Sequence, residues 1–269
     1  MFSFPNATRF AVALLLAGSL YTATQAQTTY VVTSLSDNAA QTGIDGNITL
    51  REAITAANTD AAFGDAPAGS GADIIDLTGL SGTITLEQGQ FVITQSVTIT
   101  GPGANTQVGA NTLTIDANNA DRHFDIAAGQ TVTLAEVRLS NGAPPEITIA
   151  QCANGGAINS AASSLTLRNL ELQDNSCMTQ CPSGIGCNGG AVHQGNNGII
   201  NVIGSTFVGN SVGLGVGGGL ALLSGATGEV VNSTFTENLA GDGGAIYSAA
   251  SFLLANSTVM RNDAFDFIG

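Results

Sequence analysis

An internal repeat constrains the fold of this 269-residue chain more than any other feature. Four glycine pairs open successive units, and each unit closes about 20 residues later on an apolar residue, two variable positions and an asparagine. The pairs are Gly155-Gly156, Gly189-Gly190, Gly218-Gly219 and Gly243-Gly244, and the closing asparagines are Asn175, Asn210, Asn238 and Asn262. A period of this length predicts a solenoid.

Apolar residues recur at matching positions of the four units and predict the interior of that solenoid. The first such column holds Leu165, Ile200, Gly228 and Phe252, the second Leu167, Val202, Val230 and Leu254, and the last Leu172, Phe207, Phe235 and Val259. Between the second and last columns the alternation changes phase at Asn169, Gly204, Asn232 and Asn256, which indicates a bend between two short strands. The pattern predicts an all-β fold of the parallel β-helix type, with like residues stacked about 4.8 Å apart.

The repeated polar residues have a structural interpretation. We expect Asn175, Asn210, Asn238 and Asn262 to form a ladder of stacked amides, with asparagine tolerating left-handed geometry at a bend. The glycine pairs would supply tight turns. The Gly218-Gly219 pair is not a phosphate loop, because the chain has no lysine and no helix is predicted after it.

A single amphipathic helix is predicted before the repeats. Thr49-Leu50-Arg51-Glu52 is a capping box, and Leu50, Ala53, Ile54 and Ala57 form one apolar stripe that stops near Asn58. Because the first coil of a solenoid exposes strand edges, we expect this helix to cap that end. The predicted layout is an N-terminal strand, capping helix and loop at 27–72 and a β-helix at 73–269. No second cap is predicted, so we expect the β-helix to be truncated at the C-terminus.

The N-terminus and the charge limit the location and partners. Residues 1–26 predict a secretory signal peptide, with an apolar stretch from Phe10 to Leu20 that is too short to span a bilayer and small residues before Gln27. The predicted mature chain has no membrane span. The full chain has 20 acidic residues against 6 basic ones, a net charge of −14, which argues against nucleic acid and against anionic membrane surfaces as partners.

Several segments resemble known exported bacterial proteins. The run Asn47 to Ile54, followed by Ala57-Asn58, resembles the CSLREA motif of secreted bacterial β-helix proteins, with Ile48 and Thr49 in place of its Cys and Ser. The glycine-pair and Phe-x-x-Asn repeats resemble those of polymorphic outer-membrane proteins, whose passenger domains are β-helices on the cell surface. The resemblance implies a right-handed parallel β-helix, exported and part of a surface protein, with no catalytic residues.

The four cysteines lie in one stretch, and an exported chain favours two disulfides among them. We favour Cys152–Cys187 with Cys177–Cys181, because stacking would bring Cys152 near Cys187. The alternative is a zinc site formed by Cys177, Cys181, Cys187 and His193.

The remaining chemistry-bearing residues offer few candidate sites. Asn159, His193, Leu222 and Tyr247 share a predicted outward column, which could contact a sugar or be ordinary lateral surface. Asp116, Asp121 and Asp125 with Arg122 form the most compact group of carboxylates. We expect no catalytic residues, no bound metal and no cofactor, with Ca²⁺ as an alternative.

We therefore expect a bacterial protein that is secreted or held at the outer membrane or cell surface. Its expected role is structural or adhesive without catalysis, with surface glycans or proteins of the host or of the bacterium itself as partners. The alternative is a β-helix that binds or degrades polysaccharides, as a lyase or hydrolase does, an inference from the fold alone. A groove containing several carboxylates and an arginine would favour the alternative.

Overall fold

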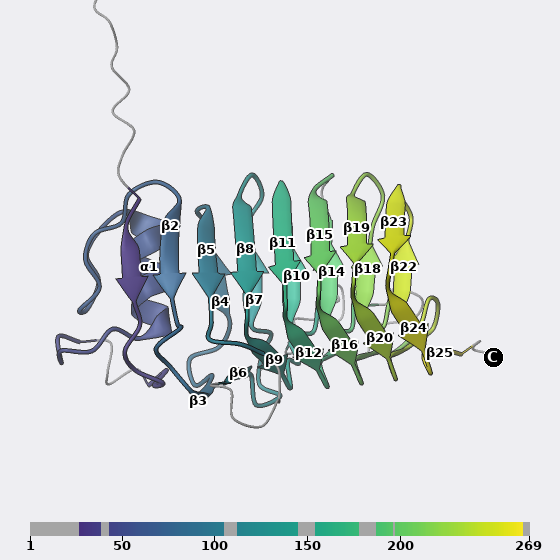
Figure 1. Cartoon of the computed structure of the whole chain (residues 1–269), viewed down its shortest axis with the longest axis horizontal. Helices are drawn as coiled ribbons and strands as arrows, with labels where there is room; N and C mark the ends of the chain where they lie inside the picture. Colours follow the sequence, from purple (N-terminus) through teal and green to yellow (C-terminus); the bar gives the residue numbers. More distant parts are fainter. Residues whose placement is uncertain are drawn as a thin grey trace, which may run out of the picture.

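The computed structural model describes residues 27–38, 43–104, 112–144, 154–177, 187–195 and 197–265, and the predicted signal peptide lies outside these ranges. The described chain is a parallel β-helix, in which short strands wind around one axis and successive coils stack side by side (Figure 1). The fold class predicted from the repeat is confirmed. Each sheet runs along the stack, and its neighbouring strands come from successive coils.

Four parallel sheets form the walls. The eight-stranded sheet contains β1 (Thr29–Val31), β2 (Asp73–Asp76), β5 (Val97–Thr100), β8 (Thr131–Ala135), β11 (Ser164–Arg168), β15 (Ile199–Ile203), β19 (Thr227–Val231) and β23 (Phe252–Ala255). The seven-stranded sheet contains β3 (Gly82–Thr85), β6 (Leu113–Asp116), β9 (Arg138–Ser140), β12 (Glu171–Gln173), β16 (Thr206–Val208), β20 (Thr234–Thr236) and β24 (Thr258–Met260).

The other two sheets complete each coil. The six-stranded sheet contains β4 (Phe91–Ile93), β7 (Phe124–Ile126), β10 (Ile158–Ser160), β14 (Val192–Gln194), β18 (Leu220–Leu222) and β22 (Ile246–Ser248). The four-stranded sheet contains β13 (Ser176–Cys177), β17 (Ser211–Val212), β21 (Leu239–Ala240) and β25 (Asp263–Ala264), and forms a corner of the later coils.

Residues with left-handed backbone geometry produce the bends between sheets. The bend after the eight-stranded sheet has positive φ at Glu136, Asn169, Gly204, Asn232 and Asn256, which include all four predicted bend positions. The bend after the seven-stranded sheet has positive φ at Asn141, Asp174, Gly209, Glu237 and Arg261. The expectation that the ladder asparagines themselves adopt this geometry is wrong, because the residue just before each of them turns the chain.

The interior is filled by the predicted apolar columns. Leu172 pairs with Phe207, Phe207 with Phe235, and Phe235 with Val259 in one register. The rings of Phe207 and Phe235 are stacked with centroids 4.3 Å apart and planes 10° from parallel. Each added coil therefore buries its apolar residues against identical positions of its neighbours.

A ladder of buried asparagines runs beside this apolar interior. The Oδ1 atom of Asn210 accepts hydrogen bonds from the backbone N–H and the Nδ2 of Asn175, at 3.0 and 2.9 Å. Asn238 accepts in the same way from Asn210, and Asn262 from Asn238. Each amide nitrogen also donates to a carbonyl of the coil behind it, as Asn210 does to Leu172 at 2.9 Å. The ladder thus satisfies polar groups that the bend would otherwise bury without partners.

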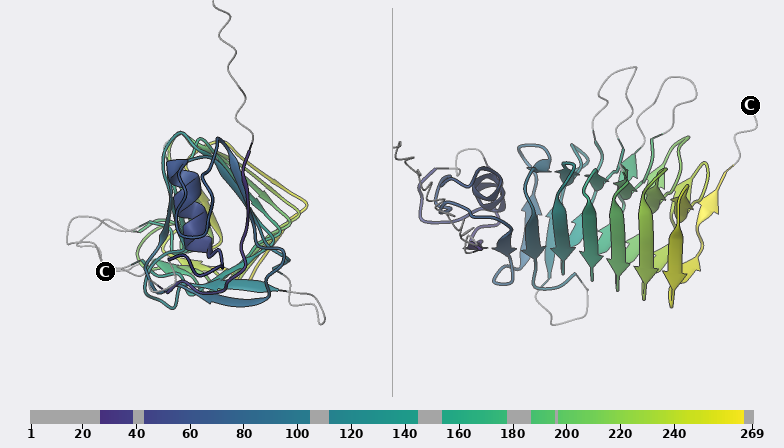
Figure 2. Two further views of the ribbon diagram at one scale, coloured as in Figure 1. Left: turned by 90° about the vertical axis from the view of Figure 1, so that its left-hand side faces the viewer. Right: turned by 90° about the horizontal axis from the view of Figure 1, so that it is seen from above.

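Helix α1 (Leu50–Thr59) covers the N-terminal end of the stack, as Figure 2 shows in the view along the axis. Thr49 and Glu52 form the predicted capping box, and the helix continues one residue beyond Asn58. Arg51 anchors the helix to the first coil through a paired contact with the Asp37 carboxylate at 2.6 and 2.9 Å. Its guanidinium also lies over the Phe91 ring, 4.5 Å from the centroid.

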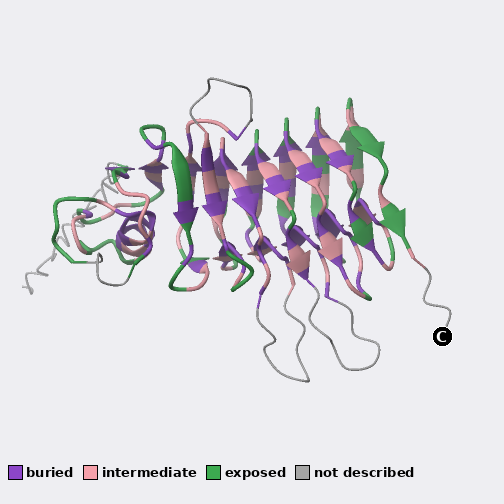
Figure 3. Ribbon diagram, turned by 90° about the horizontal axis from the view of Figure 1, so that it is seen from below, coloured by how far each residue is buried: buried purple, intermediate pink, exposed green. Residues whose placement is uncertain are grey.

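The opposite end of the described stack is uncovered. Two of the four residues of β23 and all three of β24 are exposed, whereas β12 of a middle coil alternates between intermediate and buried residues (Figure 3). Leu254 and Val259 belong to inward columns but are exposed here, because no described coil packs on them.

Candidate functional site

A polar row crosses the outer face of the six-stranded sheet. Strand pairing places Asp125, Asn159, His193, Ala221 and Tyr247 at one position of successive strands. On either side of this position the residues of β7 and β10 are buried and face the interior. Three members of the predicted column, Asn159, His193 and Tyr247, therefore share one position of the sheet, although His193 is buried rather than exposed.

The fourth predicted member, Leu222, does not belong to the row. It pairs with Gln194 and Ser248 and is fully buried, and Ala221 takes the outward position instead. Three consecutive glycines stand here, and the pair that forms the turn is Gly217-Gly218 rather than the predicted Gly218-Gly219. Gly217 has φ +71°, and an added Cβ there would overlap the Leu220 carbonyl. The prediction from Gly218-Gly219 was thus displaced by one residue.

Hydrogen bonds join the row into a directed chain. The Asp125 carboxylate accepts from Arg122 Nη1 at 3.3 Å and from Asn159 Nδ2 at 2.7 Å. Since that nitrogen is the donor of the Asn159 amide, its Oδ1 is an acceptor, and His193 Nδ1 lies 2.8 Å from it. His193 therefore carries its proton on Nδ1, and Nε2 presents a lone pair.

Burial keeps His193 neutral. Its side chain is 7% exposed, and burial, together with the nearby Arg122 charge, lowers the pKa of His193 to about 4. Among the described residues neither His193 Nε2 nor Arg122 Nε has a hydrogen-bond partner. His193 Nε2 is a buried acceptor, whereas the Asp125 carboxylate is 34% exposed. The exposed carboxylate can accept a hydrogen bond from a hydroxyl group, and a pKa this low makes His193 a weak base.

The second histidine lies elsewhere and has a structural role. His123 is fully buried, and its Nε2 lies 2.9 Å from the Ile115 carbonyl oxygen of the seven-stranded sheet. Burial lowers its pKa to about 4, although the hydrogen bond to Ile115 acts in the opposite direction. The two histidines share no site.

The predicted carboxylate group is divided between two walls. Asp116 belongs to the seven-stranded sheet, where it accepts from the Asn118 backbone and from Asn141 Nδ2. Asp121 accepts from the backbone N–H groups of Arg122 and Gln90 and so fixes a turn. Only Asp125 meets Arg122 through its side chain.

The metal and disulfide predictions concern a corner that the structure describes in part. In the described ranges no group of three or more His, Cys, Asp or Glu residues could hold a metal ion. Cys152 and Cys181 lie outside those ranges. Cys177 and Cys187 are buried side by side with Val212 and Ala240.

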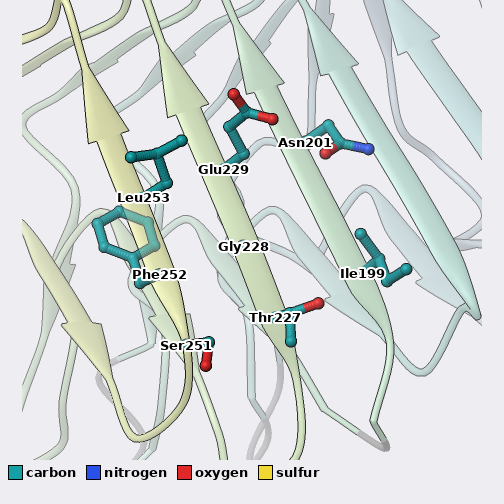
Figure 4. A pocket seen from close by; sticks show the side chains of 8 residues that line it. All are labelled: Ile199, Asn201, Thr227, Gly228, Glu229, Ser251, Phe252 and Leu253. Carbon is teal, nitrogen blue, oxygen red and sulfur yellow. The ribbon is translucent and has the colours of Figure 1, made fainter.

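A shallow depression of about 390 Å³ lies on the eight-stranded sheet near its exposed end (Figure 4). Its lining comes from three neighbouring strands and the residue before the last of them: Ile199, Asn201, Thr227, Gly228, Glu229, Ser251, Phe252 and Leu253. Ile199 and Leu253 are 49% and 54% exposed. Gly228 and Phe252 belong to a predicted inward column, and no sequence pattern singles out the outward residues beside them.

Comparison with known proteins gives one family match, to the Chlamydia polymorphic membrane protein (Chlamydia_PMP) repeat at residues 232–249. These residues run from the bend before β20 into β22 and include the turn at Gly243. No curated protein and no solved structure matches the chain. The match supports the predicted resemblance to polymorphic membrane protein repeats, which fits a surface-exposed structural or adhesive role. Among the described residues no helix is long and apolar enough to cross a membrane.

Proposed function

We propose that the chain is an exported β-helix module of a bacterial cell surface whose role is structural or adhesive rather than catalytic. The observation that carries the proposal is the polymorphic membrane protein repeat at residues 232–249, which coincides with regular stacked coils. Continuous sheets and a buried amide ladder make such a column a rigid spacer that holds its lateral faces at a fixed distance from an anchor.

The outer face of β15, β19 and β23 is the surface that best suits adhesion. Ile199 and Leu253 are large exposed apolar side chains, and Asn201 and Glu229 add polar groups beside them. Protein contact surfaces combine apolar anchors with a polar rim in this way.

An adhesion assay tests the proposal. Beads coated with the purified protein are applied to epithelial cells and to bacterial cells, and the double variant Ile199→Glu with Leu253→Glu is compared with wild type. We expect wild-type beads to adhere and the number of adhering beads to fall at least about tenfold for the variant. The circular dichroism spectrum of the variant should be unchanged. The matched control is Leu214→Glu, at an exposed apolar position between β17 and β18. Wild-type beads that adhere to neither cell type, or rapid cleavage of a polysaccharide by the protein, would contradict the proposal.

Polysaccharide binding is the second candidate function, and the polar row favours it. The Asp125 carboxylate of this row is 34% exposed and can accept hydrogen bonds, and Tyr247 lies at the same position of the sheet. A glycan array probed with and without Ca²⁺ tests this candidate. It predicts binding that Tyr247→Ala weakens, and it fails if no glycan is retained under either condition.

A further inference from the structure

Two cysteines meet at the corner formed by the four-stranded sheet. Cys177 ends β13, where it pairs in register with Val212 of β17. It is 1% exposed and faces the interior of the corner with Val212 and Ala240. The strand ladder fixes the backbone position of Cys177.

Cys187 reaches the same corner from the other side of a segment outside the described ranges. It is 2% exposed, and the next residue, Asn188, forms a parallel bridge with Val216 of the following coil. The carbonyl of Cys187 packs so closely on Gly215 that a Cβ at Gly215 would overlap it. Both cysteines are therefore fixed by neighbouring coils.

The two side chains contact each other directly. The Cys177 side chain is hydrogen-bonded to Cys187, and this bond, together with burial, raises the pKa of the Cys177 thiol. Both belong to one small apolar cluster. Sulfur atoms already in contact need little movement to reach the length of a disulfide bond, about 2.05 Å.

We propose that Cys177 and Cys187 form a disulfide bond. The two thiols lose two protons and two electrons as the S–S bond forms. The oxidant is another disulfide, such as glutathione disulfide or the active-site disulfide of an oxidase outside the cytoplasm, which is reduced to two thiols. The bond closes the chain between residues 177 and 187 and joins two successive coils at this corner. This pairing replaces the predicted Cys152–Cys187 and Cys177–Cys181 bonds.

Burial determines when the bond forms and how it breaks. Thiolate is the attacking species, and the folded corner disfavours thiolate. Oxidation therefore accompanies folding or a transient opening of the corner, and the completed bond is shielded from reductants. Dithiothreitol is expected to reduce it at least about tenfold faster in denaturant than in native buffer.

Peptide mapping by mass spectrometry tests the pairing. The whole chain is refolded with glutathione disulfide, remaining thiols are alkylated in denaturant, and the protein is digested. The expected product joins the peptides containing Cys177 and Cys187. A bond from Cys187 to Cys152, a bond from Cys177 to Cys181, or alkylation of both Cys177 and Cys187 would overturn the proposal.

Thermal unfolding of matched variants gives an independent measurement. With Cys152→Ala and Cys181→Ala, reduction is expected to lower Tm by about 5–10 °C, since a loop of this length and a chain of this size respond on that scale. With Cys177→Ala and Cys187→Ala in addition, reduction is expected to leave Tm unchanged. An unchanged Tm in the first variant, or the same decrease in both, would contradict the proposal.

Discussion

Replacing Asn210 by alanine tests whether the amide ladder stabilises the stack. Asn210 is fully buried. Its Nδ2 donates to the Leu172 carbonyl and to Asn238 Oδ1, both at 2.9 Å, and its Oδ1 accepts from the backbone N–H and the Nδ2 of Asn175. Alanine removes these four hydrogen bonds and leaves two backbone groups, the Leu172 carbonyl and the Asn175 N–H, buried without those partners.

The size of the effect follows from those two groups. Leaving a buried donor or acceptor unsatisfied costs about 1–3 kcal/mol, so Asn210→Ala is expected to lower the free energy of unfolding by about 4 kcal/mol. At about 2–4 °C per kcal/mol for a chain of this size, Tm should fall by roughly 8–16 °C. Urea unfolding followed by circular dichroism measures the free energy, and differential scanning calorimetry measures Tm.

The matched control is Asn262→Ala, at the uncovered end of the same ladder. Asn262 makes hydrogen bonds of the same kind, but it is less buried, so water can replace part of what is lost. We expect a loss of about 1–2 kcal/mol. Equal losses for both variants, or a loss below about 1 kcal/mol for Asn210→Ala, would show that the buried amide ladder does not stabilise the stack.

Three further predictions concern a turn, a buried base and the cap. Gly190→Ala should lower the free energy of unfolding in urea by about 3 kcal/mol or more, because the added Cβ would overlap the Gly218 carbonyl. Gly213→Ala is the control and should change this free energy little, because the space around Gly213 is open. His123 has a pKa of about 4 in the folded protein against 6.5 unfolded. Its stabilising contribution is therefore complete above pH 6.5 and falls between pH 6.5 and 4, and a pH series of Tm should show a smaller decrease for His123→Gln. Arg51→Lys should lose the paired contact with Asp37 and lower stability by about 1–3 kcal/mol, and a loss no larger than that of an exposed Arg→Lys control would contradict this role.

The sequence predicted the later coils well because stacking repeats the same residue types at the same positions. The last apolar column follows directly from the repeat, and strand pairing confirms it for Leu172, Phe207, Phe235 and Val259. The cap was predicted because a capping box is a local signal. The capping box joins residues that are close in the sequence, and the stacking contacts recur in every coil, so both leave a pattern in the sequence.

The candidate site could be predicted only in part. Three glycines in a row offered two equivalent turns, and only hydrogen bonding selects Gly217, so Leu222 was placed outward in error. The hydrogen bond between Asn159 and Asp125 joins a coil that has the glycine pair to one that lacks it. The repeat alone could therefore not align these two residues. The contact between Cys177 and Cys187 depends on the corner geometry of neighbouring coils.

Surface location is the central claim, and labelling of intact cells tests it most directly. Antibodies against the β-helix are applied to intact and to lysed cells of the organism that makes the protein, and extracellular protease digestion is followed on immunoblots. Antibody binding and protease cleavage on intact cells are expected. Detection only after lysis, with full protection from protease before it, would show that the protein is not at the cell surface.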